Sequence, residues 1–273
     1  MISNILAWTT VYDLNKPELL EVNFFDVGQG DAIFVETPGF RQILIDGGPD
    51  STILEKLSRE MPFWDRTIDL IILTHPDPDH LNGLIQVLKS YKVNLVGFNG
   101  AKGDNPSFSE WQKLITENKI PLTVLSKGKR IWLTKEIFLD VLSPKESFEG
   151  REIKDFNSSS IVARLVYNEN EYFFTGDAPK SIEKELIESG VNLESDVLKV
   201  AHHGSKTSTT EEFLEKVKPE IAVISVGENN RYQHPHQEVL ETLAKYGIRT
   251  LRTDLDNDIK IISDGTNYAI STL

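Results

Sequence analysis

The order of apolar segments along the chain limits its possible folds more than any other feature of the sequence. Short apolar or alternating runs, separated by Gly28-Gln29-Gly30 and Pro38-Gly39, predict an antiparallel meander at residues 20–45. From residue 50, strand-like and helix-like segments alternate, and the same order returns after a polar stretch at 143–159. Two such sections predict an α/β fold in which two β-sheets pack together and helices cover the outside.

The expected boundaries follow from the apolar runs and the turn residues that flank them. Strands are expected at residues 20–27, 32–36, 42–45, 70–73, 95–98, 122–125, 131–133, 137–142, 161–166, 172–175, 197–200, 221–225, 250–252, 259–262 and 268–270. Helices are expected at residues 52–59, 81–90, 108–118, 181–188, 210–217 and 237–246. Because no internal repeat or low-complexity segment divides the chain, residues 1–273 are expected to form a single domain.

The composition is that of a globular protein, with 39% hydrophobic and 26% charged residues. No apolar run approaches the ~18 residues of a membrane span, and the first 21 residues lack the features of a signal peptide. We therefore expect a soluble, cytoplasmic chain without membrane insertion. Since the chain has no cysteine, disulfides and thiolate metal sites are excluded, and any metal must be held by nitrogen and oxygen.

The net charge of −13 argues against a broad surface for long nucleic acids, because such surfaces are normally basic. Basic residues gather locally at Lys127, Lys129 and Arg130, and again at Lys199, Lys206 and Arg231. Taken singly, each is more often a solvated surface charge. The second group flanks histidine-containing segments, so a restricted positive groove is left open.

All six histidines fall in three short polar segments, each of which follows an apolar strand. The pairs are His75 and His80, His202 and His203, and His234 and His236. Histidines that served only packing or the surface would be scattered, so this clustering indicates a functional site.

The first segment reads Thr74-His75-Pro76-Asp77-Pro78-Asp79-His80. In an extended chain His75 and Asp77 project to the same side, and the two prolines delay the following helix, so that Asp79 and His80 lie at its start. Two of these four side chains can bind one cation and two a second one. The alternative is a helix N-cap formed by Asp79, which would leave the histidines unexplained.

The other two segments are weaker signals by themselves. Asp177 follows an apolar strand in Thr175-Gly176-Asp177, which is more often a turn, but a carboxylate shared by two cations is what the first segment lacks. Neighbours on a strand face opposite ways, so we expect one of His202 and His203 to bind metal and the other to bind substrate. An exposed strand end is the alternative.

In this order the segments resemble the metallo-β-lactamase-like domain of ComEC-type DNA-uptake proteins. The residues that carry the resemblance are Phe24 to Ala32, Ile45 to Gly48, Thr74 to His80, Phe174 to Asp177, Ala201 to Ser205, Ser225 to Gly227, His234-Pro235, Arg252 to Asp254 and Ile259 to Gly265. The resemblance covers the chain from about residue 20 to its end and implies an αββα sandwich with metallohydrolase chemistry. In ComEC proteins the domain is joined to a membrane channel, which is not expected here, and is proposed to degrade the DNA strand that is not imported.

The resemblance also implies a ligand set. It assigns His75 and Asp77 to one divalent cation, Asp79, His80 and either His202 or His203 to the other, and Asp177 to both. Asp77 stands where the fold usually has a second histidine. The larger share of oxygen ligands makes manganese a candidate beside zinc.

Two further residues lie beside this ligand set by the same resemblance. The histidine usually found before the shared aspartate has no counterpart, and the segment Asn157 to Ser160 stands in its place, which leaves the first cation site incomplete. Asp46 resembles the fold's buried aspartate that orders the ligand loop from behind.

We therefore expect a two-metal hydrolase of phosphodiester bonds, in which the cations activate water and no protein nucleophile is needed. Asp79 is the expected proton acceptor, and His234 would contact the phosphate or protonate the leaving oxygen. Substrate contacts are expected from Lys206, Asn230, Arg231 and His236. For His236 the alternative is a helix cap.

Three functional alternatives stay open. The resemblance favours a nuclease acting on DNA or RNA, single-stranded DNA in particular. The acidic net charge favours a small phosphodiester, such as a cyclic nucleotide or a choline phosphate. A catalytically silent fold that serves as a regulatory binding partner is supported only by the missing histidine.

Overall fold

The computed structural model describes residues 19–103, 105–151 and 153–272. Its strands are β1 (Leu20–Phe24), β2 (Ile33–Glu36), β3 (Gln42–Ile45), β4 (Thr67–Ile68), β5 (Leu70–Leu73), β6 (Lys92–Val93), β7 (Val96–Phe98), β8 (Leu122–Val124), β9 (Arg130–Trp132), β10 (Ile137–Ser143), β11 (Val162–Tyr167), β12 (Asn170–Phe174), β13 (Val197–Lys199), β14 (Ile221–Ile224), β15 (Arg249–Arg252), β16 (Ile259–Ser263) and β17 (Tyr268–Thr272). Its helices are α2 (Thr52–Glu60), α3 (Pro78–Ser90), α4 (Pro106–Glu117), α5 (Lys180–Glu188), α6 (Glu211–Val217), α7 (Gln237–Lys245) and α8 (Thr253–Asp256), with short 3₁₀ turns η1 (Asn157–Ser159) and η2 (Ala201–Gly204).

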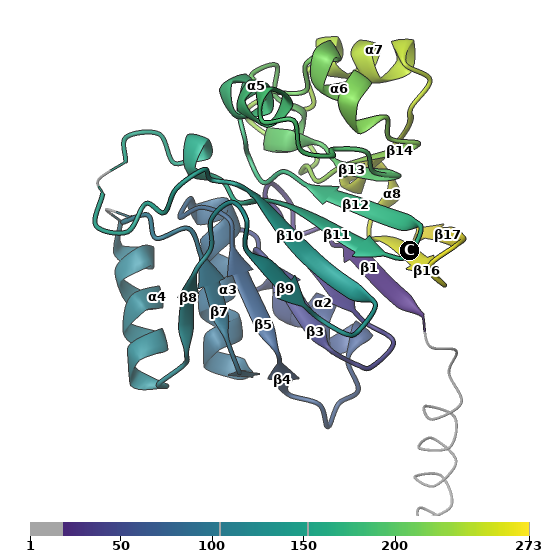
Figure 1. Ribbon diagram of the computed structural model, residues 1–273. Coiled ribbons are helices and arrows are strands. Elements are labelled where there is room, and N and C mark those ends of the chain that lie inside the picture. Colours follow the sequence, from purple (N-terminus) through teal and green to yellow (C-terminus); the bar gives the residue numbers. More distant parts are fainter. Residues whose placement is uncertain (1–18, 104, 152, 273) are drawn as a thin grey trace, which may run out of the picture.

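Two large mixed sheets form the centre of the fold (Figure 1). The first has the order β17-β16-β1-β2-β3-β5-β7-β8 and the second the order β15-β14-β13-β12-β11-β10-β9. In the first sheet β3, β5, β7 and β8 are parallel, and in the second β12 to β15 are parallel. The first section of the sequence builds most of the first sheet and the second section most of the second, but β9 and β10 join the second sheet, and β16 and β17 return to the first.

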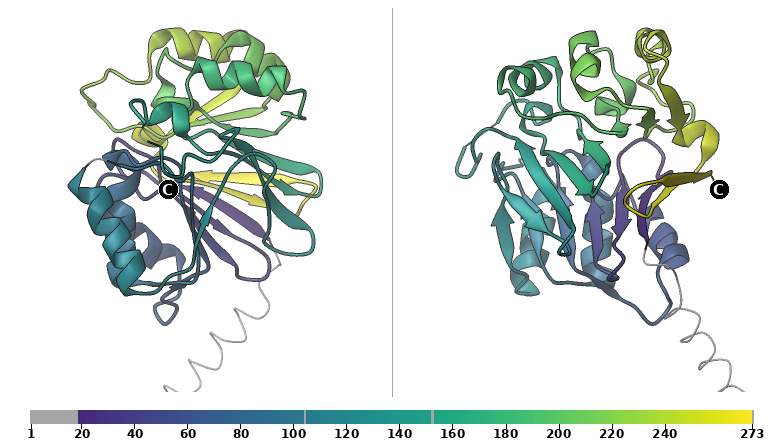
Figure 2. Two further views of the ribbon diagram at one scale, coloured as in Figure 1. Left: turned by 60° about the vertical axis from the view of Figure 1, so that its left-hand side comes forward. Right: turned by 45° about the vertical axis from the view of Figure 1, so that its right-hand side comes forward.

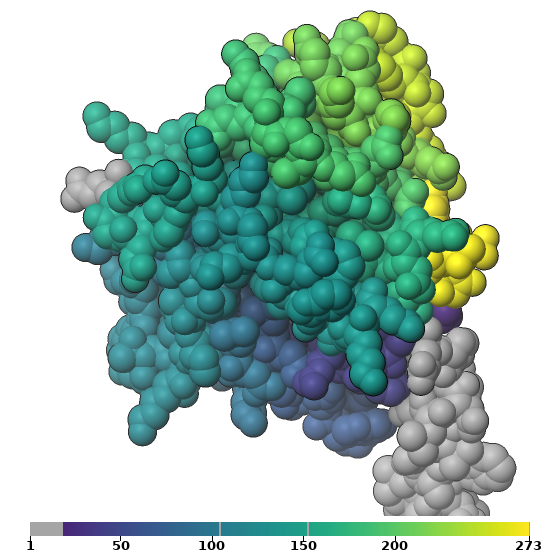
Figure 3. Space-filling model, viewed as in Figure 1, coloured from purple at the N-terminus to yellow at the C-terminus, as the bar shows by residue number. Residues whose placement is uncertain are grey.

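Three apolar layers hold these elements together. One lies between the sheets, and the other two lie between each sheet and its helices. Helices α2, α3 and α4 cover the first sheet, whereas α5, α6 and α7 cover the second (Figures 1 and 2). In the space-filling view the second group, coloured green to yellow, forms the upper part of the molecule (Figure 3). This arrangement confirms the expected αββα sandwich.

Strand β5 shows why the sequence forms such layers. Its four residues Leu-Ile-Ile-Leu are all buried, and a parallel strand covered on both faces needs a continuous apolar run. Leu70 and Ile72 face the other sheet, whereas Ile71 and Leu73 pack against the helices. The strand is therefore fixed on both faces up to Leu73, directly before the first histidine segment.

The structure departs from several expected boundaries, among them the end of β1, which lies at Phe24 rather than at residue 27. Helix α3 begins at Pro78 rather than at residue 81, because a proline in the first turn lacks only an N–H that would have no helical partner. Strand β13 ends at Lys199, before the histidine pair. The short elements β4, β6 and α8 were not predicted, since two to four residues are too few to show a period.

Within the described ranges, no helix combines the length and the apolar character that crossing a membrane would require. The expectation that the chain begins without a signal peptide concerns mainly residues 1–18, which lie outside the described residues. The single-domain organisation of residues 1–273 stays a prediction.

Candidate metal centre

The polar segments that follow parallel strands of the two sheets meet at one place. His75 follows β5 of the first sheet, and Asp177 and His203 follow β12 and β13 of the second. Asp177 Oδ2 lies 4.0 Å from His75 Nε2 and 3.5 Å from His203 Nε2. The expected convergence of strand ends therefore occurs across the junction of the two sheets.

In the part of the chain that the structure describes, three groups of potential ligand atoms share His80. One of them, with Asp31 and Asp46, faces the Nδ1 atom of His80, which Asp46 already contacts at 2.8 Å, and the other two are the candidate cation sites. His75, His80 and Asp177 form one group, and Asp79, His80 and His203 form the other, with the atoms of each group within 4.8 Å of one another. Asp77 adds a carboxylate oxygen 3.5 Å from His75 Nε2. Of the two carboxylates on the α3 side, Asp79 is not the helix cap, because the cap position is occupied by Asp77.

Among the described residues, the atoms that point into the centre make no hydrogen bond, although carboxylate oxygens lie 3.4–3.5 Å from the histidine nitrogens. The Nε2 atoms of His75, His80 and His203 and the Oδ1 atom of Asp177 are buried without a hydrogen bond. Buried polar atoms are nearly always paired, so such a cluster requires an explanation. Nitrogen and carboxylate oxygen are ligands for zinc and manganese, and the residues therefore fit a divalent cation.

Asp46 fixes the tautomers of two histidines from behind. Its carboxylate accepts hydrogen bonds from the Thr74 backbone N–H (2.8 Å) and the Thr74 hydroxyl (2.7 Å), and His80 Nδ1 lies 2.8 Å from the same carboxylate. Because the Thr74 hydroxyl donates to Asp46, it accepts from His75 Nδ1 (2.9 Å). Both rings thus carry their proton on Nδ1 and keep the Nε2 lone pair for a cation.

His202 and His203 do not face opposite ways, so that expectation is wrong. Both adopt left-handed backbone conformations, with φ of 50° and 54°, inside the turn η2. In consequence both rings approach Asp177, with His202 Nε2 3.9 Å and His203 Nε2 3.5 Å from Oδ2. The alternation rule fails because strand β13 has already ended.

The two rings nevertheless differ in their surroundings. His203 is buried, and its Nδ1 donates to the Ser225 carbonyl (2.9 Å), which leaves Nε2 free. His202 keeps about a quarter of its side chain exposed, and its Nε2 lies 3.4 Å from the Asn157 amide nitrogen. Asn157 therefore lies beside His202 rather than among the ligand groups.

A buried ion pair that sequence reasoning missed supports this centre. Lys199 is 1% exposed, pairs with Asp31, and donates to the Gly176 carbonyl (3.0 Å). Asp31 Oδ1 lies 3.4 Å from His203 Nδ1. Lys199 consequently cannot line a positive surface groove, which corrects one of the expected groove residues.

The electrostatic field of the centre favours positive charge. Burial disfavours the cationic form of His203, but Asp177 and Asp31 outweigh burial and raise its pKa to about 10. Burial also opposes ionisation of Asp177, but His203 and His80 outweigh this and hold its pKa well below its usual range. Bound protons satisfy the carboxylates in this state, and a divalent cation would satisfy them equally.

The segment after β14 forms the other wall of the site. The His234 ring lies 5.5 Å from that of His202, and burial together with the neighbouring histidines lowers the pKa of His234 to about 4. His236 occupies the N-cap position of α7, but its side chain makes no capping hydrogen bond, and its Nδ1 instead accepts the backbone N–H of Lys206 (3.2 Å). Lys206 and Arg231 are both exposed.

Asn230 was expected to contact substrate, and the structure gives it a different task. Its amide nitrogen donates to the carbonyls of Gly227 (3.0 Å) and His234 (2.6 Å), and its oxygen accepts the N–H groups of Tyr232 (3.2 Å) and His234 (3.0 Å). All four positions of the amide are occupied, so Asn230 orders this segment rather than binding substrate.

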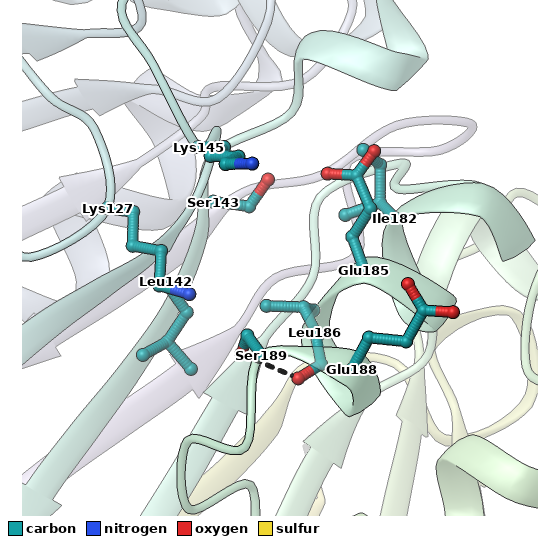
Figure 4. Close-up of a pocket in the computed structure, with 9 residues that line it drawn as sticks. All are labelled: Lys127, Leu142, Ser143, Lys145, Ile182, Glu185, Leu186, Glu188 and Ser189. Atoms are coloured by element: carbon teal, nitrogen blue, oxygen red, sulfur yellow. Dashed lines mark hydrogen bonds between the residues drawn. The ribbon is translucent and has the colours of Figure 1, made fainter.

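A separate hollow lies between β10 and α5 (Figure 4). It measures about 370 Å³, and lysine ammonium groups on the strand side face glutamate carboxylates on the helix side. None of its nine lining residues belongs to the ligand groups. The histidine segments and this hollow are therefore distinct features.

The sequence profile of the Metallo-beta-lactamase superfamily matches residues 25–228, a span that contains both ligand groups. The chain belongs to this superfamily. At the coarse level it is a metal-dependent hydrolase, in agreement with the metal centre expected from the sequence.

Relatives confirm the resemblance to ComEC-type proteins. The chain is 35% identical to ComE operon protein 3 of Bacillus subtilis over 88% of its length, and 32% identical to Recombination protein 2 of Haemophilus influenzae over 91%. It covers 32% and 29% of these two proteins. The chain thus spans about a third of the length of these relatives.

Solved structures support the fold alone. A metallo hydrolase, Igni18, from Ignicoccus hospitalis aligns with a TM-score of 0.57 at 13% identity, covering 93% of this chain and 99% of the other. Zinc-bound PqqB from Methylobacterium extorquens aligns with a TM-score of 0.54 at 11% identity, covering 82% and 85%. At such identities only the αββα sandwich is shared.

Proposed function

We propose that this protein is a binuclear metal-dependent phosphodiesterase whose substrate is single-stranded DNA. The observation that carries the proposal is the pair of ligand groups that share His80, one of which contains Asp177, with buried Nε2 atoms that make no hydrogen bond among the described residues. Two adjacent cation sites are the arrangement used to hydrolyse phosphodiesters.

The ligand groups suggest one division of the residues. His75, Asp77 and Asp177 would hold one cation, and Asp79, His80 and His203 would hold the other, with Asp177 within reach of both. When bound, zinc or manganese would supply Lewis acidity and a water of lowered pKa. Asp77 and Asp79 raise the share of oxygen ligands, which keeps manganese beside zinc as a candidate.

The remaining side chains would bind and orient the substrate. Burial opposes ionisation of Asp79, but His203 and His80 outweigh it and hold the pKa of Asp79 below its usual range, which suits a ligand better than a proton acceptor. His234 is neutral near pH 7 because its pKa is lowered to about 4. It can therefore donate a hydrogen bond to a phosphate oxygen, with Lys206 and Arg231 adding positive charge nearby.

Single-stranded DNA is favoured by the similarity to ComE operon protein 3 and Recombination protein 2. A small phosphodiester is the second candidate, favoured by the net charge of −13 and by the burial of Lys199, which leaves fewer cations for a polynucleotide. The two candidates predict different substrates for the same metal centre.

An activity panel tests the proposal. Purified protein would be loaded with zinc or manganese and given single-stranded DNA, double-stranded DNA, RNA, a cyclic nucleotide and an aryl phosphodiester. Metal-dependent cleavage of single-stranded DNA in preference to the others is expected. Cleavage of only the small esters would favour the second candidate, and no cleavage of any substrate with either metal would remove the hydrolase proposal.

Metal content tests the ligand assignment separately. We expect two bound cations per wild-type chain, and His203→Ala should lower this number. His202→Ala should leave the number of bound cations unchanged and lower turnover, because His202 Nε2 already faces Asn157. Lys127→Ala, in the separate hollow of Figure 4, is the matched control and should change neither quantity. Equal loss of metal from both histidine variants would contradict the assignment.

A further inference from the structure

A hollow adjoins the metal centre on the side of Asp79. It measures about 470 Å³ and is lined by Pro49 and Pro78 from the first half of the chain and by Arg231 and Tyr232 from the segment after β14. Asp79, which belongs to one ligand group, forms part of the same lining. A molecule in this hollow would therefore lie next to the ligand group that contains Asp79.

Tyr232 presents a flat aromatic surface at this hollow. The side chain is 47% exposed, and its ring is stacked on His234 at 5.7 Å between centroids and 22° between planes. The Arg231 guanidinium lies 4.7 Å from the centroid of the Tyr232 ring. Other large apolar side chains are exposed among the described residues, but none of those lines this hollow.

The segment that carries Tyr232 is held in place before any ligand arrives. Asn230 bonds to the backbone on both sides of Tyr232, and Gly227 N donates to the Gln29 side-chain oxygen (3.3 Å). A pre-ordered aromatic side chain loses little conformational entropy on binding. The exposed ring is thus suited to contact a ligand.

We propose that this hollow binds the nucleobase next to the scissile phosphate by stacking it on the Tyr232–Arg231 pair. The inference rests on the proposed nuclease function and deepens it. A base brings a flat π surface, for which aromatic rings and guanidinium planes are the usual partners, while its phosphate reaches toward the metal centre beside Asp79.

The same hollow is not built to read the identity of the base. Asn230, the amide best placed to contact a base edge, uses all its hydrogen-bonding positions within its own segment. Stacking depends on a π face that every base possesses. The subsite therefore accepts any base without selecting a sequence.

A double-mutant cycle tests this subsite. A labelled single-stranded oligonucleotide would carry one abasic residue, moved position by position past the cleavage point. With wild-type protein, the abasic residue at one flanking position should raise KM by about 5- to 150-fold, the range expected for one lost stacking contact. With Tyr232→Ala the intact oligonucleotide should show that loss already, and the abasic residue should add less than about 2-fold.

Two control variants separate stacking from general damage. Tyr232→Phe keeps the ring and should retain the abasic penalty. Trp132→Ala removes an aromatic side chain that is 58% exposed on β9, far along the second sheet, and should behave as the wild type. The same cycle measured as dissociation constants of metal-depleted protein gives a readout that does not depend on turnover.

The outcomes distinguish the two proposals. If oligonucleotides are cleaved but the abasic penalty is equal in wild type and Tyr232→Ala at every position, the subsite is refuted and the nuclease function stands. If no oligonucleotide is cleaved with either metal while an aryl phosphodiester is, the nuclease function is refuted and the base subsite with it.

Discussion

Replacing Gly83 with alanine should disturb the metal centre from behind helix α3. The turn after β3 rests directly on this helix, with Gly47 N donating to the His80 carbonyl (2.8 Å) and Gly83 N donating to the Gly48 carbonyl (2.9 Å). A Cβ at residue 83 would lie 1.8 Å from the Gly47 carbonyl oxygen and 2.5 Å from the Gly47 carbonyl carbon. Both atoms belong to the backbone, so the turn must move away.

Several effects determine how far Gly83→Ala changes the free energy of unfolding. Alanine is favoured over glycine inside a helix by about 1 kcal/mol, which would stabilise the variant. Against this, overpacking costs about 1–3 kcal/mol, and weakening two backbone hydrogen bonds costs about 1 kcal/mol each. We therefore expect the free energy of unfolding to fall by about 2–4 kcal/mol. Because the same turn carries Asp46, which orients His80, metal affinity should fall as well.

Urea unfolding of metal-free protein measures the first effect, and metal titration measures the second. Gly39→Ala is the matched control, because a Cβ at Gly39 would meet nothing within 4 Å and its φ is not positive. That variant should change stability by less than about 0.5 kcal/mol. A Gly83→Ala protein as stable as the control would refute the close packing of the turn on α3.

Three further predictions concern other charged groups. Burial raises the pKa of Glu183, so its contribution to stability is full below its unfolded pKa of about 4.3 and is lost as pH rises through the raised folded pKa. In urea unfolding, the stability of wild type relative to Glu183→Gln should therefore fall as pH rises above about 4.3. Lys199→Met leaves Asp31 buried without its cation and should cost about 3–5 kcal/mol of unfolding free energy, a loss that adding Asp31→Asn should partly restore. Lys206→Glu and Arg231→Glu should weaken cleavage of single-stranded DNA far more than cleavage of an aryl phosphodiester, with metal content unchanged. The salt dependence of DNA cleavage should become flatter as well. An equal effect on both substrates would favour the small ester.

The convergence of the candidate ligands could be predicted from sequence because a simple rule connects their positions to the fold. Carboxyl ends of parallel strands share one edge of a sheet, so polar residues directly after buried strands come together. His75, Asp177 and the turn carrying Asp46 all obey this rule. Asn99, directly after β7, obeys it too and was overlooked, although its amide ties the Thr74 carbonyl (3.1 Å) to that of Ser159 (2.7 Å).

Other features of the site depend on contacts that local patterns do not contain. The left-handed backbone at His202 and His203 follows from the tight turn η2, and two non-glycine residues with positive φ are not predicted from strand alternation. The pair of Asp31 and Lys199 joins residues 168 positions apart, across both sheets. Asn230 was expected to contact substrate because it lies near His234 in the sequence and has an amide side chain. The sequence does not show that this amide already makes hydrogen bonds within its own segment.

Metal removal should separate folding from function, because the apolar layers do not depend on the metal centre. The layers between and outside the sheets are made of apolar residues and contain no member of the ligand groups, so chelation should leave the far-UV circular dichroism spectrum intact. Cation binding to the folded state alone adds about 2.7 kcal/mol per site at 100 times the dissociation constant. Chelation should therefore lower Tm by several degrees and abolish hydrolysis, while restored zinc or manganese recovers both. A chain that loses its secondary structure on chelation would show instead that the cations hold the two sheets together.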